Sequence, residues 1–226
     1  MKKSIITLLF CYFSSLSAGT IPELKQNTLN GIAHLPGWCS EEKALSFIDL
    51  VLQVKPKICV EIGVYSGRSL FPVASALKFL GQGIVIGIDP WDTLECIKHF
   101  DPIKDAGHFQ WWSKESQLEQ MRQICLNMIK RNGLEDHCKI IRATSQKAAH
   151  EIDGIDILHL DGNHSESVSI QDVKLYLPKV RSGGYIWIND TTWDNLYEPW
   201  ELLSEACDVV KAINTDAGVC VLLKKR

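Results

Sequence analysis

Short apolar runs alternate with longer amphipathic stretches along most of the chain. Near-continuous apolar runs predict buried strands at residues 57–63, 83–89, 138–143, 156–160 and 185–189. Stretches with helical spacing lie between or before them, at residues 41–54, 69–80, 113–131, 145–152 and 165–177. Strands that are apolar throughout and separated by helices are typical of a parallel sheet covered on both faces. The pattern therefore predicts an α/β fold with three layers, α/β/α.

The end of the chain breaks this rhythm. A helix is expected near residues 195–206, and two strand-like runs follow at 207–213 and 218–225. The short link between these runs is typical of a hairpin. The mostly parallel, doubly wound sheet is therefore expected to end in an antiparallel strand. A turn is expected at residues 182–184, where two glycines precede the fifth strand.

The first 19 residues have the layout of a secretory signal peptide. Two lysines precede an apolar stretch at residues 5–13, and small residues follow through Gly19. Residues 20–40 contain proline and glycine and are interpreted as a connector. Residues 41–226 are expected to form a single domain, because neither a repeat nor a second compositional region interrupts them. The alternative for residues 1–19 is the apolar start of a cytosolic protein.

The cysteines favour the cytosolic alternative. The chain has eight, none of them in a C-x-x-C pair, and seven remain once residues 1–19 are removed. This inventory is typical of a reducing compartment, whereas the leader indicates export to the periplasm or the medium. The sequence leaves the localisation open.

Charge and hydropathy exclude two classes of partner. The formal net charge is −3, and there is no basic stripe, so we expect no nucleic-acid partner. No apolar run reaches the length of a membrane-spanning helix, so we expect no membrane span.

Two strand ends carry residues suited to a nucleoside. Ligands of doubly wound sheets bind beyond the carboxyl ends of the strands. Glu61-x-Gly63-x-x-x-Gly67 follows the first strand, and its carboxylate stands where a dinucleotide fingerprint has glycine. It suits an amine or a hydroxyl better than a pyrophosphate. Asp89 ends the second strand and is placed to bind ribose hydroxyls, and Trp91 could cover adenine. The alternative is a capping Asp89 and a packing Trp91.

Two further strand ends carry oxygen ligands. Asp161 follows the fourth strand, and Asn189 and Asp190 follow the fifth. Adjacent strands would bring these three together, and such ligands suit Mg²⁺. His164 would then lie near the metal as a general base. The alternative is that Asp161 and Asp190 only cap the following helices. The long stretch 91–112, with His108, Trp111 and Trp112, either shapes this site or is a surface loop.

A family resemblance joins these strand ends. The segments VEIGVYSGRS, GIDPW and ILHLDGNHSESVSIQDVKLYLPKVRSGGYIWIND resemble the class I S-adenosylmethionine-dependent methyltransferases over roughly residues 42–224. The likeness is greatest to small-molecule O-methyltransferases of macrolide-sugar tailoring and to cephalosporin-hydroxylase-like proteins. It implies a Rossmann-like seven-stranded sheet. The implied cofactor-binding residues are Glu61, Gly63, Ser66, Gly67, Ser69, Asp89, Trp91, Thr144, Ser145 and Asp161.

The resemblance also implies catalytic and metal-binding residues. These are His164 and Asp161 for catalysis, and Asp161, Asn189 and Asp190 for a divalent metal. Two positions depart from the family pattern. Asn189 stands where an acidic residue is common, which removes a charge from the metal site. Ala143-Thr144 stands where Gly-Asp is common before the serine, which weakens the expected adenine contacts.

The sequence thus predicts a methyltransferase that uses S-adenosylmethionine, with or without Mg²⁺, to methylate a small-molecule or sugar hydroxyl. Cofactor synthesis in the cytosol also favours a cytosolic location. One alternative is a nucleoside-binding or partner protein on the same fold, without catalysis. A nicotinamide-dependent oxidoreductase is disfavoured by Glu61. Whether the chain forms a homo-oligomer stays open.

Overall fold

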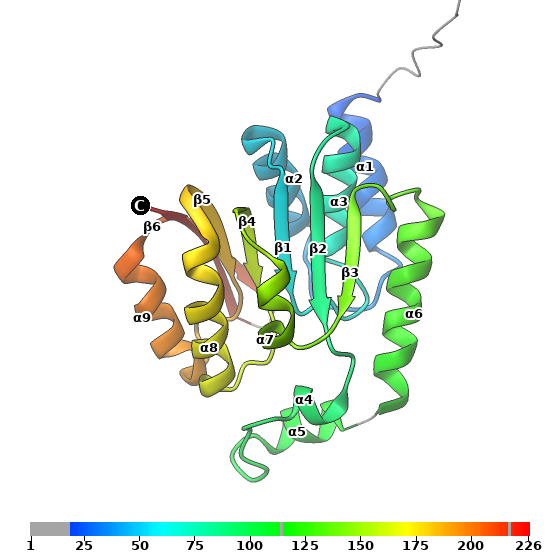
Figure 1. Cartoon of the computed structure of the whole chain (residues 1–226). Coiled ribbons are helices and arrows are strands. Elements are labelled where there is room, and N and C mark those ends of the chain that lie inside the picture. Colours follow the sequence, from blue (N-terminus) through cyan, green and yellow to red (C-terminus); the bar gives the residue numbers. More distant parts are fainter. Residues whose placement is uncertain (1–18, 114, 217) are drawn as a thin grey trace, which may run out of the picture.

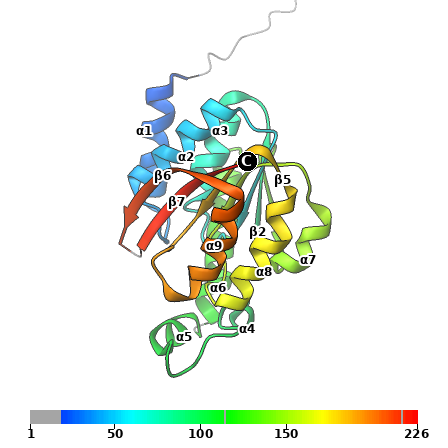
Figure 2. The same cartoon turned by 90° about the vertical axis from the view of Figure 1, so that its left-hand side faces the viewer.

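The computed structural model describes residues 19–113, 115–216 and 218–226, which form a twisted sheet with helices on both faces (Figures 1 and 2). Within these residues the sheet has seven strands, ordered β3-β2-β1-β4-β5-β7-β6. Strand β7 runs antiparallel to both β5 and β6, and the pairs among β1–β5 are parallel. The predicted fold class and its reversed final strand are confirmed. The strands are β1 (Ile58–Ile62), β2 (Ile84–Asp89), β3 (Cys138–Arg142), β4 (Ile155–Leu160), β5 (Val180–Ile188), β6 (Cys207–Thr215) and β7 (Gly218–Lys225).

Two apolar clusters, one on each face of the sheet, hold the layers together. Neighbouring residues of β1 show the period of a strand, because Cys59 packs into the first cluster and Val60 into the second. The first face is covered by α1 (Ile21–Ile32), α2 (Glu41–Val54), α3 (Leu70–Leu80) and α6 (Glu115–Arg131). The second is covered by α7 (Ser145–Ala148), α8 (Glu166–Tyr176) and α9 (Tyr197–Ala206), with single 3₁₀ turns at Ala149–Glu151, Leu177–Lys179 and Asp194–Leu196.

The predicted connector at residues 20–40 is corrected by the structure. Helix α1 occupies most of it and packs against α3, so it belongs to the domain. Thr20 and Glu23 form a capping box at its start, and Pro22 stands in the first turn. Proline and glycine content suggested a connector, but the proline is a helix-start signal here. The leader predicted over residues 1–19 lies outside the described residues, apart from Gly19.

Strand β5 also begins earlier than predicted. The expected turn at residues 182–184 lies inside the strand, where the pairing of β4 with β5 shifts register between Ile155 and Ile157. The irregularity absorbs the two glycines without ending the strand. Helices α4 (Thr93–Cys96) and α5 (Ala106–Trp112) lie beyond the carboxyl ends of the strands, at the bottom of Figure 1. They therefore stand over the edge where a ligand is expected.

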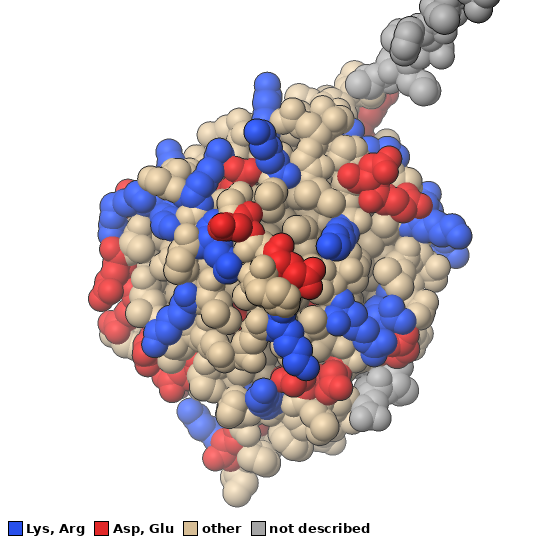
Figure 3. Space-filling view, viewed as in Figure 1, with Lys and Arg blue, Asp and Glu red and all other residues tan. Residues whose placement is uncertain are grey.

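The surface and the cysteines add three observations. The face seen in Figure 3 mixes basic and acidic side chains, and the absence of a nucleic-acid partner stays a prediction. Within the described residues, none of the helices has both the length and the apolar character of a membrane span. The seven described cysteines are free thiols, and six of them are buried.

Candidate active site

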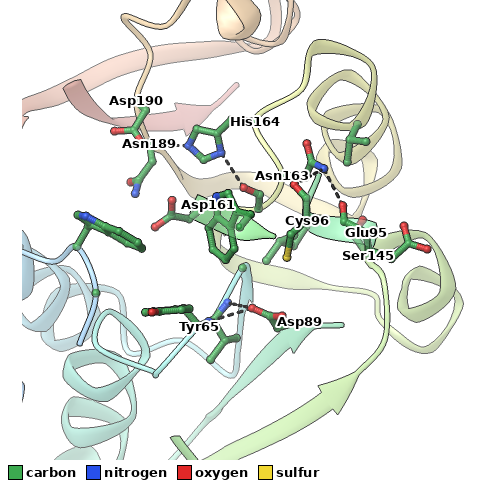
Figure 4. Close-up of a pocket in the computed structure, with 18 of the residues that line it drawn as sticks. Tyr65, Asp89, Glu95, Cys96, Ser145, Asp161, Asn163, His164, Asn189 and Asp190 are labelled. Atoms are coloured by element: carbon green, nitrogen blue, oxygen red, sulfur yellow. Dashed lines mark hydrogen bonds and ion pairs between the residues drawn. The ribbon is translucent and has the colours of Figure 1, made fainter. Parts of the chain in front are cut away.

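A pocket of about 500 Å³ opens beyond the carboxyl ends of β1, β2, β4 and β5. Figure 4 shows Tyr65 and Asp89 on one side of it, and Asp161, His164 and Asp190 on the other. We call these two sides the glycine-loop end and the carboxylate end. The glycine-loop end comprises Gly63, Tyr65, Asp89, Thr144 and Ser145. The carboxylate end comprises Lys43, Asp161, His164, Asn189 and Asp190.

Gly63 lets two main-chain segments meet at the base of the glycine-loop end. Its φ is +86°, and a Cβ there would lie 1.9 Å from the backbone oxygen of Asp161. No side chain fits at this position. The loop after β1 and the loop after β4 therefore touch directly, which joins the two ends of the pocket.

Asp89 organises the glycine loop through its carboxylate. Its Oδ2 accepts hydrogen bonds from the backbone N–H of Val64 and of Tyr65, each 2.9 Å long, and its Oδ1 accepts one of 2.7 Å from Trp91. Burial raises the pKa of Asp89 above its ordinary value against these hydrogen bonds, which lower it. The residue lines the pocket, as expected of a ribose ligand, but its visible partners are main-chain groups. It does not cap α4, whose N-cap is Asp92.

Glu61 lies behind the pocket wall, where it accepts a hydrogen bond from Ser69 Oγ. Its other carboxylate oxygen has no hydrogen-bond partner among the residues that the structure describes. Ser69 lines the pocket and so stands between Glu61 and any ligand. Ser66 donates to the carbonyl of Pro36 and is not part of the lining.

Gly67 and Trp91 pack into the core. A Cβ on Gly67 would meet Met128 and Cys125 of α6. Trp91 is buried and donates from Nε1 to the carbonyl of Tyr65 at 2.8 Å. The packing alternative for Trp91 is therefore the one that the structure shows.

The turn after β3 supplies Thr144 and Ser145 to the pocket. Thr144 caps α7 by accepting from the N–H of Lys147, and Ser145 Oγ donates to Asp172 on α8. Asp172 also lines the pocket, and burial raises its pKa to about 7 against the hydrogen bond from Ser145. Asp172 is a residue of the site that sequence reasoning did not predict. A carboxylate four residues before the buried Tyr176, on the same helix face, could have revealed it.

The carboxylate end brings together Asp161, His164 and Asp190. One ligand atom from each lies within 4.8 Å of the other two. His164 Nε2 is 2.9 Å from Asp190 Oδ2, and Nδ1 is 2.7 Å from the carbonyl oxygen of Gly162. Neither Asp161 nor Asp190 caps a following helix, because the N-caps of α8 and α9 are Ser165 and Leu196. The capping alternative is therefore wrong.

The contacts of His164 define its protonation. A carbonyl oxygen only accepts, so Nδ1 carries a proton. Burial by itself lowers the pKa of His164, but the hydrogen bond to Asp190 and the charges of Asp161 and Asp190 outweigh it, and the pKa ends above its ordinary value. The raised pKa favours the imidazolium paired with Asp190, and the neutral form is the one that can accept a proton at Nε2. Loss of the Nε2 proton would leave a lone pair on Nε2 that points in the direction of the former N–H bond.

Asn189 is turned toward the interior. Its Oδ1 lies 2.8 Å from Lys43 Nζ, 3.0 Å from Cys220 Sγ and 3.3 Å from His159 Nε2. The oxygen that was expected to bind a metal therefore already faces three groups of the protein. The structure brings Asp161 and Asp190 together as predicted, with His164 as their third neighbour in place of Asn189.

Lys43 is the second residue that sequence reasoning missed. It comes from the first turn of α2, its side chain is 1% exposed, and its Nζ is 3.6 Å from Asp161 Oδ2. Burial lowers the pKa of Lys43. The charge of Asp161 and smaller contributions from other neighbouring groups outweigh burial and raise the pKa, so the amine stays an ammonium. Lys43 falls four residues before the buried Phe47. A lysine on the apolar side of a helix was the available signal.

Aromatic rings line the mouth of the pocket. Trp38 and Trp111 have ring centroids 5.1 Å apart, and Trp111 and Trp112 4.6 Å. His108 lies 5.9 Å from Trp193, which lies 5.3 Å from His164. Burial, and then the charge of His164, lower the pKa of His108 to about 4, so its ring is neutral. The segment 91–112 thus shapes the pocket.

Comparison with known proteins identifies the class of this fold and pocket. The family model described as "Methyltransferase domain" matches residues 60–191, more than half of the chain. The chain therefore belongs to this methyltransferase family. The class predicted from the sequence, an S-adenosylmethionine-dependent methyltransferase, is confirmed. None of the curated proteins is significantly similar to the chain in sequence.

Solved structures of similar fold include three that cover nearly the whole chain. Cofactor-bound Rv0187 from MTB has a TM-score of 0.63 at 13% identity, covering 94% of this chain and 92% of that one. The O-methyltransferase from Bacillus cereus in complex with SAH has a TM-score of 0.60 at 14% identity, covering 90% of this chain and 91% of that one. The O-methyltransferase TomG from Streptomyces achromogenes in complex with SAM has a TM-score of 0.61 at 14% identity, covering 95% of each chain. TomG is involved in tomaymycin synthesis.

Proposed function

We propose that this protein transfers the methyl group of S-adenosylmethionine to a hydroxyl group of a small molecule. The observation that carries the proposal is the His164–Asp190 pair, which faces the pocket next to the glycine-loop end. The structurally similar O-methyltransferases from Bacillus cereus and Streptomyces achromogenes support the choice of oxygen as acceptor.

The glycine-loop end would hold the cofactor. Gly63 leaves the backbone open for a close approach, and Ser69 can reach the amino-acid part of the ligand while Glu61 orients its hydroxyl. Asp89 stands next to the expected ribose, and Ser145 with Asp172 next to the expected base. When bound, the cofactor supplies a methyl sulfonium, and the protein aligns the acceptor oxygen with it.

His164 would act as the general base. The contact of Nδ1 with the carbonyl of Gly162 fixes the ring and leaves Nε2 as the atom that exchanges a proton. In its neutral form, Nε2 takes the proton of the acceptor hydroxyl, and Asp190 stabilises the imidazolium that results. The pocket would then hold the deprotonated oxygen in line with the methyl group of the bound cofactor.

The predicted divalent metal has mixed support. Asp161, His164 and Asp190 are close enough to hold a cation. The predicted set of three oxygen ligands is not formed, because Asn189 Oδ1 faces Lys43. Mg²⁺ prefers oxygen ligands in near-ideal octahedral geometry, so this set with one imidazole suits it poorly. The steps above therefore use the side chains of the protein alone.

The aromatic mouth supports an acceptor that carries a ring. Trp38, Trp111 and Trp112 offer flat apolar faces at the mouth, where each ring also lies against Tyr65. Such faces pack well against an aromatic ring or the apolar face of a sugar. A phenolic or sugar hydroxyl could then reach His164.

Calorimetric titration of the full chain with S-adenosylhomocysteine tests the cofactor assignment. We expect binding in the micromolar range, much weaker binding by the Asp89→Asn variant and unchanged binding by Asp208→Asn, which alters an exposed carboxylate on β6. Absence of binding by the folded wild-type protein would overturn the proposal. Binding without transfer to any hydroxyl acceptor would favour the alternative of a nucleoside-binding protein.

A further inference from the structure

The carboxylate end contains a cation that the proposed reaction does not yet use. Lys43 Nζ donates to Asn189 Oδ1 at 2.8 Å and lies 3.6 Å from Asp161 Oδ2. The same nitrogen is 5.6 Å from the ring centroid of Phe47. A buried ammonium is costly unless charged and hydrogen-bonding groups surround it, and here both are present. Its position in the pocket lining places it among the reacting groups.

Each of the two carboxylates at this end has a nitrogen-bearing side chain of the protein beside it. Asp190 is paired with His164 at 2.9 Å, and Asp161 has Lys43 as its cationic neighbour. Residue 189, which could have supplied a third carboxylate, is a neutral asparagine whose oxygen is directed at Lys43. A divalent cation bound between Asp161 and Asp190 would therefore lie close to the Lys43 ammonium, whose Nζ is 3.6 Å from Asp161 Oδ2. Like charges at such short separation in a buried site repel strongly.

We infer that Lys43 is the resident cation of the reaction centre and takes the place of a divalent metal. Lys43 is a positioning residue: it neutralises Asp161 and fixes Asn189, so that methyl transfer proceeds without an added metal ion. The inference deepens the proposed function and rests on it for the reaction. During transfer, the acceptor proton moves to His164 Nε2, the O–CH₃ bond forms and the S–CH₃ bond breaks. Lys43 keeps its protons throughout.

Binding of Mn²⁺ alone, followed by electron paramagnetic resonance on the full chain, tests the inference without a known acceptor. We expect no specific Mn²⁺ binding by the wild-type protein. Lys43→Met removes the charge and should raise the affinity for Mn²⁺ by at least about tenfold, because the repulsion is lost. Lys43→Gln should act in the same direction while keeping a donor for Asn189. Lys211→Met is the matched control. Lys211 is exposed on β6 and pairs with Glu42 on the outer side of α2, the helix that carries Lys43.

A second readout separates this inference from the proposed function. The affinity for S-adenosylhomocysteine should be the same in the wild type and in Lys43→Met, since Lys43 lies at the carboxylate end. Specific Mn²⁺ binding by the wild type that Asp161→Asn abolishes would overturn the inference, whatever the variants at position 43 do. Failure to bind S-adenosylhomocysteine would instead count against the proposed function.

Discussion

The glycine-loop end and the carboxylate end of the pocket are built in different ways. At the glycine-loop end, the carboxylate of Asp89 is held by the main chain of the loop after β1 and of the turn that follows β2. At the carboxylate end, side chains meet from segments far apart in the sequence, and Lys43 and Asn189 are 146 positions apart. Backbone contacts define the first end, and a balance of buried charges defines the second.

This difference indicates which substitutions each end tolerates. A main-chain loop is sensitive to shape, because an added Cβ strikes backbone atoms that cannot move aside. A charge balance is sensitive to the loss of a single charge, because the partner is then left buried and alone. We therefore expect changes at the glycine-loop end to affect folding and cofactor binding. Changes at the carboxylate end should affect turnover.

The largest effect is expected from His164→Ala. Loss of the base should lower turnover by about 10²–10⁴-fold, the usual contribution of general base catalysis. The affinity for S-adenosylhomocysteine should stay within about twofold of the wild type, because a change confined to the carboxylate end leaves the cofactor contacts intact. Transfer of a labelled methyl group to a panel of phenols and sugars, beside calorimetry, measures both. Unchanged turnover would exclude His164 as the base.

Gly63→Ala should have the largest effect on stability. The new Cβ meets the backbone of Asp161 and takes a φ that side chains rarely adopt. We expect a loss of at least about 3 kcal/mol in the free energy of unfolding. Gly183→Ala is the matched control, because it has a similar φ of +74° with open space around it. Denaturant unfolding that gives equal losses for the two variants would show that close approach at Gly63 is unimportant.

Asp172→Asn should change stability in a manner that depends on pH. The pKa of Asp172 is raised in the folded state to about 7, so the folded state holds a proton that the unfolded chain releases near pH 4. Its contribution to stability is therefore present below about pH 4 and is lost as the pH rises to about 7. The free energy of unfolding of the Asp172→Asn variant should exceed that of the wild type by about 2–3 kcal/mol at pH 8 and by little near pH 4. Urea unfolding that shows the same difference at both pH values would contradict this.

A smaller effect is expected at the aromatic mouth. Trp111→Ala removes one face of the pocket and should raise the KM for a ring-bearing acceptor several-fold, corresponding to about 1 kcal/mol. Trp111→Phe keeps a ring and should restore most of the loss. Initial-rate kinetics with the acceptor from the panel measures the change. A fall in cofactor affinity in place of a rise in KM would assign Trp111 to the glycine-loop end.

Much of the fold could be predicted from the sequence, because the apolar runs of the parallel strands are long and the turns between them are marked by glycine and proline. The meeting of Asp161 with Asp190 followed from the same rule, since adjacent parallel strands end at the same edge. Helix α1 was missed although Thr20, Pro22 and Glu23 form a recognisable start signal. The composition of residues 20–40 suggested a connector, whereas the order of Thr20, Pro22 and Glu23 marks the start of a helix.

The side-chain partners of the site were harder to predict. Lys43 and Asp172 reach the pocket from helices, and neither lies in a motif of the strand ends. The orientation of Asn189 depends on Lys43, which the sequence places on another element. Trp91 follows Asp89 closely, yet its ring turns into the core. Periodicity shows which face of a helix is buried, but which distant side chains share that space depends on the packing of the whole chain.

The buried thiols of this domain are natural probes of local unfolding. Cys138, Cys59, Cys220 and Cys207 lie on β3, β1, β7 and β6, and so sample the sheet from one edge to the other. Burial raises the pKa of Cys138 and of Cys220 to about 12, so neither presents a thiolate at neutral pH while the protein is folded. Alkylation at each of these positions can occur only as fast as the surrounding segment opens. Mass spectrometry of the labelled peptides would therefore show the order in which the sheet comes apart, with no dye or engineered tag.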